Sequence, residues 1–251
     1  MSMFEAHKER IITGSALAGV VLIIGFIDNF FLMWLTLGVV YIIAFKEAVR
    51  LFGVERDNLL PFAGALWIAA AFYPYGDDLF VLAGVIYASA VAFNKNLPWR
   101  DFLPFLYPTA GMLFILTLYT QYGVVSLLWL LIVVALADIG AYAVGKSIGK
   151  TPFSQTSPNK TMEGVAGGMA VATFGGMFVG LSIVDFSVAL VISFAVALSS
   201  IFGDLFESSL KRNAGVKDSG NLLPGHGGVL DRIDGYLFGA IVMLVLLRGL
   251  V

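Results

Sequence analysis

Long apolar runs separated by short polar connections dominate the chain. About 20 apolar residues in a helix cross the roughly 30 Å of hydrocarbon in a bilayer. The pattern therefore predicts an all-α fold, a polytopic transmembrane helical bundle of about nine spans. The third and fourth runs are short, so a re-entrant hairpin that does not fully cross is the alternative for that pair. The runs cover residues 11–27, 30–45, 61–74, 79–93, 103–120, 124–144, 164–184, 187–206 and 235–250.

Composition agrees with a membrane protein. Hydrophobic residues make up 59% and charged residues 13% of the 251 residues, and the mean hydropathy is +0.91. With no cysteine and only two histidines, disulfides, thiolate chemistry and a multi-histidine metal site are excluded. We see no linker that would separate domains. We therefore predict a single integral membrane domain over 1–251, with mainly structural spans in 1–123 and catalytic spans and cytoplasmic loops in 124–251.

The distribution of Lys and Arg predicts the orientation in the membrane. If nine spans alternate, only Arg248 of the 15 basic residues lies on the side opposite to the N-terminus. We expect the N-terminus and both glycine-rich loops to be cytoplasmic, in a multi-pass protein of the cell (inner) membrane. The basic residues on the N-terminal side include Lys8, Arg10, Lys46, Arg50, Arg56, Lys95, Arg100, Lys146, Lys150 and Lys160.

The densest group of charges lies between Ser199 and Asp234. Its first half has helical periodicity, and polar side chains recur there at the spacing that places them on one face. Ionisable residues in a membrane helix are costly and usually functional. The polar face consists of Ser200, Asp204, Glu207 and Lys211.

The second half of this stretch has no periodicity and is rich in glycine. Glycines allow turns with positive φ and a close approach of backbone N–H groups to a ligand such as phosphate. Carboxylates suited to Mg²⁺ alternate there with cations suited to phosphate oxygens. A solvated, flexible loop is the alternative. The residues are Gly215, Lys217, Asp218, Gly220, Gly225, His226, Gly227, Gly228, Asp231, Arg232 and Asp234.

The sixth run carries one carboxylate, Asp138, beside a row of small residues. Ala137, Ala141 and Gly145 repeat at the four-residue spacing that allows close helix packing. A carboxylate in an apolar span needs a partner. Asp138 is therefore interpreted as an active-site residue, with a purely structural hydrogen bond to a neighbouring helix as the alternative.

A second polar block precedes the seventh run. Ser157 followed by Pro158 is typical of an N-cap and first helical residue, so we expect the seventh helix to begin there. The free N–H groups of a helix start favour phosphate. Lys160 in that first turn opposes the helix dipole, which makes sense chiefly if an anion binds nearby. The glycines that follow, from Gly164 to Gly180, are interpreted as packing positions.

Two blocks of residues resemble the signature of the phosphatidate cytidylyltransferases, also called CDP-diacylglycerol synthases. The first reads Ser208-x2-Lys211-Arg212-x4-Lys217-Asp218-x-Gly220-x3-Pro224-x-His226-Gly227-Gly228-x2-Asp231-Arg232-x-Asp234. The second reads Asp138-x2-Ala141-Tyr142-x2-Gly145-x3-Gly149, followed by Ser157-Pro158-Asn159-Lys160-Thr161-x-Glu163-Gly164.

The resemblance implies transfer of a cytidylyl group from CTP to phosphatidic acid, with release of diphosphate, in phospholipid biosynthesis. It implies Mg²⁺, with a second cation left open. The expected partners are CTP, phosphatidic acid, the bilayer and, as one option, a second copy of the chain, and not a nucleic acid. Catalytic roles fall on Asp218, Asp231, Lys217, Lys211 and Arg212. Metal roles fall on Asp218, Asp231, Asp234, Asp204, Glu207 and Asp138. Substrate-binding roles fall on Ser157, Asn159, Lys160, Thr161, Gly225, His226, Gly227, Gly228 and Arg232.

Three other functions are alternatives to this one. A CTP-dependent polyprenol or lipid kinase would release CDP instead of diphosphate. An ion-coupled secondary transporter would place its charges near the middle of the bilayer, whereas the carboxylates here lie near the ends of their runs. A CDP-alcohol phosphotransferase is disfavoured because the chain has no D-G-x2-A-R run.

Overall fold

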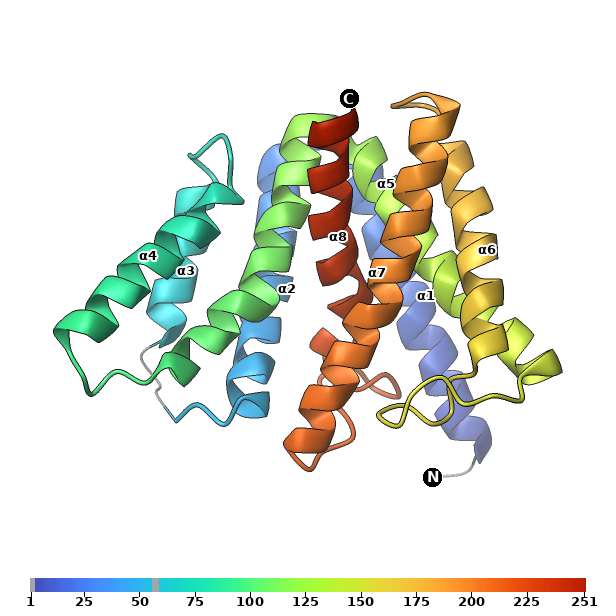
Figure 1. Cartoon of the computed structure of the whole chain (residues 1–251), viewed down its shortest axis with the longest axis horizontal. Helices are drawn as coiled ribbons and strands as arrows, with labels where there is room; N and C mark the ends of the chain where they lie inside the picture. The colour runs from blue at the N-terminus through green and yellow to red at the C-terminus, as the bar shows by residue number, and fades with distance from the viewer. Residues whose placement is uncertain (1–2, 56–58) are drawn as a thin grey trace. The chain divides into compact units, whose positions relative to one another are not determined.

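A computed structural model describes residues 3–55 and 59–251, with side chains from residue 12 onward. This part of the chain is helical and contains no β-strand, which confirms the predicted all-α class (Figure 1). Of the basic residues counted above, Arg56 and the side chains of Lys8 and Arg10 lie outside the described part. The elements are α1 (Met3–Ile27), α2 (Phe30–Leu51), α3 (Leu59–Ala70), α4 (Asp78–Phe93), η1 (Trp99–Phe102), η2 (Phe105–Thr109), α5 (Ala110–Ile148), α6 (Met162–Gly180), α7 (Phe186–Asn213) and α8 (Leu230–Leu250).

Each predicted run coincides with a helical segment, but the number of spans is not thereby confirmed. Five helical segments of the described chain are long and apolar enough to cross a membrane, and three others are shorter. The 12 residues of α3 rise only about 18 Å. Two predicted runs merge in α5, where Gly123 with φ of 73° and ψ of −179° interrupts the helical backbone between them.

The chain divides into two compact units. The first contains 1–116 and 213–233, and the second contains 117–212 and 234–251. Most of the glycine-rich part of the signature therefore packs in the unit that contains α1 to α4. The prediction of one integral membrane domain stays a prediction.

In the first unit, aromatic side chains join α2 to α3 and η2. The ring centroids of Tyr41 and Trp67 lie 5.2 Å apart, and those of Phe45 and Phe105 lie 5.0 Å apart. Tyr41 and Thr109 also share a 2.9 Å hydrogen bond between their hydroxyls. Such pairs combine apolar burial with a specific ring geometry. Helix α2 thus has one well-packed face.

In the second unit, α5 and α6 approach closely through small residues. A Cβ added at Gly164 would lie 2.7 Å from the Ala141 carbonyl oxygen and 3.0 Å from the Cα of Gly145. No side chain larger than hydrogen fits at such a distance. This confirms the predicted packing role of the small-residue row and of the glycines that face it. A 2.9 Å hydrogen bond from the Trp129 indole to Ser193 adds α7 to the same core.

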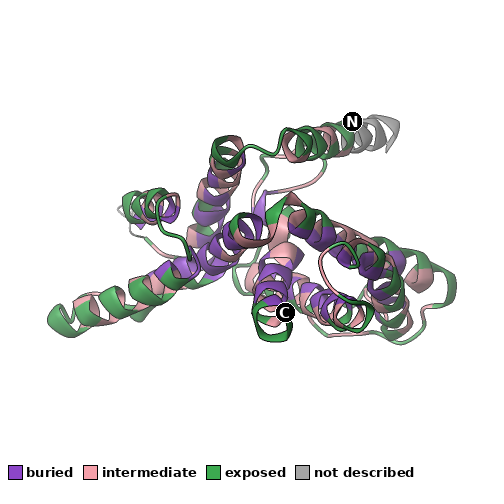
Figure 2. Cartoon of the chain, turned by 90° about the horizontal axis from the view of Figure 1, so that it is seen from above, coloured by how far each residue is buried: buried purple, intermediate pink, exposed green. Residues whose placement is uncertain are grey.

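Exposed apolar side chains cover much of the helical surface. Phe26 and Phe93 are 91% and 95% exposed. Figure 2 shows buried residues along one side of most helices and exposed residues along the other. A surface of this kind suits lipid chains.

The start of α6 differs from the prediction. The N-cap is Thr161, whose hydroxyl accepts a 3.2 Å hydrogen bond from the Gly164 N–H, so the expected start at Ser157 and Pro158 is wrong. Ser157 and Pro158 instead begin a turn, in which the Lys160 N–H donates to the Ser157 carbonyl at 3.1 Å. Proline suits the second position of such a turn as well as the first turn of a helix.

Candidate active site

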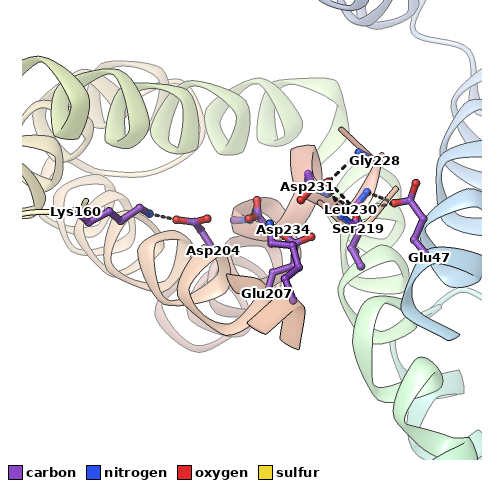
Figure 3. Close-up of polar contacts among 11 residues, drawn as sticks. Glu47, Lys160, Asp204, Glu207, Ser219, Gly228, Leu230, Asp231 and Asp234 are labelled. Atoms are coloured by element: carbon purple, nitrogen blue, oxygen red, sulfur yellow. Dashed lines mark hydrogen bonds and ion pairs between the residues drawn. The ribbon is translucent and has the colours of Figure 1, made fainter. Parts of the chain in front are cut away.

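Charged side chains gather in the second unit around the C-terminal half of α7. The ammonium of Lys160 forms an ion pair with the Asp204 carboxylate (Figure 3). One turn further along α7, Lys211 donates to Glu207 at 3.0 Å, and Glu207 is fully buried. The predicted polar face of this helix is therefore confirmed.

Two more carboxylates belong to this group. Asp234 of α8 forms a side-chain hydrogen bond with Glu207, and the charge of Asp138 from α5 acts on both Asp234 and Lys160. Four carboxylates thus surround two ammonium groups. The hydrogen bond between Asp234 and Glu207 requires one shared proton, so an excess of one negative charge remains, and it rises to two if that proton leaves. A divalent cation would balance that excess.

The pKa of Lys160 is lowered. Burial is the largest cause, because it disfavours the charged amine, and the positive charge of Lys211 acts in the same direction. The carboxylates of Asp138 and Asp234 oppose the shift. Lys160 is therefore a partly desolvated amine beside several acids, and not an ordinary surface lysine.

The loop that carries Lys160 is closed by hydrogen bonds at its base. Glu163 accepts from the N–H groups of Lys150 and Thr151 at 3.1 and 3.2 Å, and from the Thr151 hydroxyl at 2.9 Å. The Met162 N–H donates to the Thr151 carbonyl at 2.8 Å. The Phe153 N–H also donates to the Lys160 carbonyl at 2.8 Å. Lys160 and Thr161 therefore lie in the paired base of the loop, and Ser157 and Asn159 lie beyond it.

In the first unit, two carboxylates meet the beginning of α8 (Figure 3). Asp231 Oδ2 accepts from the N–H groups of Ser219 and Gly228, both at 2.8 Å. Glu47 of α2 accepts from the N–H groups of Val229 and Leu230 at 3.1 and 2.7 Å. The N–H groups at a helix start have no partner within the helix. Protein carboxylates supply one here.

This arrangement corrects the predicted boundary of the loop. The stretch from Asp231 to Asp234 was expected in the irregular part, but it lies in the first turns of α8. A carboxylate at a helix start is stabilised by the helix dipole. Asp231 therefore supports the helix in which it stands.

The glycine turn has internal hydrogen bonds. The N–H groups of His226 and Gly227 donate to the Leu223 carbonyl at 2.8 and 3.1 Å. Gly225 and Gly227 have φ of 73° and 84°, as expected for turn glycines. The His226 ring lies 3.4 Å from the Pro224 carbonyl oxygen. Backbone donors that were predicted to hold phosphate are thus engaged within the protein, and the binding roles stay predictions.

The other predicted site residues of the signature lie at the surface. Lys217, Asp218 and Arg232 in the first unit and Arg212 in the second are exposed. Exposed cations reach phosphate groups more easily than buried ones, at a smaller gain per contact. These positions fit a role in substrate contact, which stays a prediction.

The six predicted metal ligands fall into two sets. Asp138, Asp204, Glu207 and Asp234 belong to the second unit, and Asp218 and Asp231 belong to the first. Carboxylate oxygens are the ligands that Mg²⁺ prefers, so the donor type fits. Within the described residues, however, no three acidic or histidine side chains are gathered as a ready-made metal site.

Glu47 was missed from the sequence. It is 4% exposed and stands three residues after buried Ala44 and six after buried Tyr41, on the packed face of α2. A carboxylate on the apolar face of a helix is a signal in itself, since it must find donors when buried. Glu163 and Ser219 were likewise not assigned roles, although Glu163 stands inside the second block.

Comparison with known proteins agrees with the family that the two sequence blocks resemble. The model of the cytidylyltransferase family matches residues 8–250. A phosphatidate cytidylyltransferase of Helicobacter pylori strain J99 is 46% identical over 244 residues, which cover 96% of this chain and 92% of that protein. A phosphatidate cytidylyltransferase of Thermotoga maritima is 33% identical over 265 aligned positions, with 96% of both chains covered. One of Bacillus subtilis is 46% identical over 123 residues, or 47% of this chain and 45% of that protein. The chain therefore belongs to the cytidylyltransferase family.

Proposed function

We propose that this protein is a phosphatidate cytidylyltransferase, which converts CTP and phosphatidic acid into CDP-diacylglycerol and diphosphate. The observation that carries the proposal is the pair of lysine–carboxylate contacts in the second unit, Lys160 with Asp204 and Lys211 with Glu207. The names of relatives that align over nearly the whole chain supply the substrates.

The chemistry requires little proton transfer. An oxygen of the phosphatidic acid phosphate forms a bond with the α-phosphorus of CTP, and the bond from that phosphorus to the bridging oxygen of diphosphate breaks. A phosphomonoester is largely dianionic at pH 7, since its second pKa is about 6. The enzyme therefore needs to position the two anions and offset their charge. In the second unit we assign this role to Lys160 and Lys211, and in the first to Lys217 and Arg232.

We further propose that Mg²⁺ takes part. The carboxylates of Asp204, Glu207, Asp138 and Asp234 in the second unit, and of Asp218 and Asp231 in the first, are the candidate ligands. A bound divalent cation would polarise phosphate oxygens and offset charge at the reacting phosphorus. The excess of acids over lysines in the second unit supports this part of the proposal.

The membrane setting is also proposed. With nine spans, the asymmetry of Lys and Arg supports a cytoplasmic N-terminus, a site at the cytoplasmic face of the inner membrane and access to cytosolic CTP. A shallow pair formed by α3 and α4 would leave seven spans and the same orientation.

The decisive experiment uses the purified full chain with CTP carrying ³²P at the α-position. In the presence of Mg²⁺ and phosphatidic acid, label should enter the lipid fraction and diphosphate should be released. Omission of phosphatidic acid should abolish both. Formation of CDP with a phosphorylated lipid instead would establish the kinase alternative and refute the transferase.

The same assay tests the cation. Chelation with EDTA should remove activity, and Mg²⁺ or Mn²⁺ should restore it, because oxygen ligands favour these ions over Zn²⁺. Full activity after chelation would exclude the cation from the mechanism.

A further inference from the structure

Glu47 is the least expected carboxylate of the first unit. Its carboxylate oxygens accept hydrogen bonds from two backbone N–H groups and one hydroxyl. These donors belong to residues 172 to 183 positions away in the sequence. All of these partners belong to the signature segment between Ser219 and Leu230. No cation is among the partners of Glu47 in the described part of the chain. Its charge is therefore balanced by N–H dipoles at the start of α8.

Ser219 links Glu47 to Asp231. The Ser219 hydroxyl lies 3.0 Å from Glu47 Oε2 and 2.9 Å from Asp231 Oδ2. A hydroxyl has one proton, so it donates to one of these carboxylates at a time. The same oxygen lies 3.3 Å from the Asp231 N–H. Glu47, Ser219 and Asp231 thus form one continuous polar chain.

The three side chains of this polar network are buried. Glu47, Ser219 and Asp231 are 4%, 6% and 7% exposed. Position 228, next to Glu47, requires glycine, because a Cβ at Gly228 would lie 2.6 Å from Glu47 Oε2. Side chains in such surroundings have few alternative positions. A displacement of Glu47 would be transmitted to Asp231.

We propose that Glu47 is a positioning residue that holds the Ser219–Asp231 segment, and with it the Asp231 carboxylate, in the geometry used for cytidylyl transfer. The inference rests on the proposed function for its catalytic part. It adds a residue of α2, outside both signature blocks, to the residues on which activity depends. Glu47 itself acts through Ser219 and α8 and touches no reacting atom.

The variants Glu47→Ala and Glu47→Gln test the proposal, with Asp101→Asn as a matched control. Asp101 is also 4% exposed and belongs to the same unit. Gln keeps one acceptor oxygen but replaces the other with a donor, so it should retain part of the effect. Hydrogen exchange of the backbone is measured first, because it does not depend on activity.

In Glu47→Ala, amide exchange at Val229 and Leu230 should rise at least about tenfold. Glu47→Gln should give a smaller rise, and Asp101→Asn none at these amides. Unchanged exchange in both Glu47 variants would overturn the proposal. If wild-type protein transfers no cytidylyl group while the exchange result holds, the proposed function fails and the holding role of Glu47 stands.

Kinetics and a double-mutant cycle test the catalytic part. Glu47→Gln should lower kcat at least about tenfold and leave the KM for CTP within about threefold, as expected for loss of an interaction used in the transition state. In a Ser219→Ala background the further loss from Glu47→Gln should be much smaller, because the link to Asp231 is already broken. If the fold reductions in kcat of Glu47→Gln and Ser219→Ala simply multiply in the double variant, or if only KM rises, Glu47 only stabilises the fold.

Discussion

At the scale of single residues, Asp218 and Asp231 differ in what their loss should affect: turnover alone for Asp218, and both turnover and stability for Asp231. Asp231 is buried and holds two backbone N–H groups, whereas Asp218 is exposed. We expect Asp218→Asn and Asp231→Asn each to lower turnover at least about a hundredfold, which corresponds to a few kcal/mol of transition-state stabilisation. Steady-state rates with labelled CTP provide the measurement.

Thermal unfolding in detergent serves as the control for these two variants. Asp218→Asn should leave the unfolding temperature unchanged, while Asp231→Asn should lower it, because the amide offers fewer acceptor sites to the N–H groups of Ser219 and Gly228. Near-normal turnover of either variant would contradict its assigned role.

His226 is the tempting choice for a general base, and we expect it not to be one. Its ring lies against Pro224 and near Gly14 of α1, where a Cβ would be 3.6 Å from Nε2. Because the attacking phosphate is already anionic, no base is needed. His226→Gln should lose far less activity than Asp218→Asn and should keep the shape of the wild-type pH–rate profile. Loss of turnover together with the acidic limb of that profile would restore a proton-transfer role.

At the scale of helices, the contact between α5 and α6 depends on Gly168. A Cβ there would lie 2.8 Å from the Ala141 nitrogen and 3.0 Å from its Cβ. Gly168→Ala should therefore force the helices apart and destabilise the protein by about 1–3 kcal/mol. The fall in unfolding temperature in detergent measures this effect.

Gly64 in α3 is the matched control for Gly168, since nothing lies within 4 Å of a Cβ added there. Gly64→Ala should be neutral or stabilising by up to about 1 kcal/mol, because alanine favours a helix over glycine. Equal unfolding temperatures for the two variants would show that α5 and α6 do not pack as described.

At the scale of the whole molecule, the orientation can be tested with single cysteines, because the native chain has none. Asp185 and Asn221 are both exposed and lie on opposite sides in the predicted topology. Asp185→Cys should react with an impermeant thiol reagent in intact cells, and Asn221→Cys should react only after lysis. The reverse pattern would refute the cytoplasmic placement of the signature and the access to cytosolic CTP.

Much of this protein could be predicted from local patterns. Apolar runs located the helices. The spacing of four, three and four residues from Ser200 through Asp204 and Glu207 to Lys211 predicted a polar face that the structure confirms. The row from Ala137 to Gly145 predicted close packing, since helix faces follow from spacing alone. The signature residues indicated the family that the comparisons then showed.

Only the tertiary structure decided which groups the buried carboxylates bind. The donors to Glu47 come from residues more than 170 positions away, so no window of sequence contains both partners. The start of α8 at Leu230 depends on the Glu47 carboxylate as acceptor, because buried N–H groups require acceptors. The start of α6 was misplaced for a related reason. Ser157 and Pro158 suit a turn and a helix start equally well. The ion pair of Lys160 with Asp204 and the bridge of Thr161 to Pro152 favour the turn.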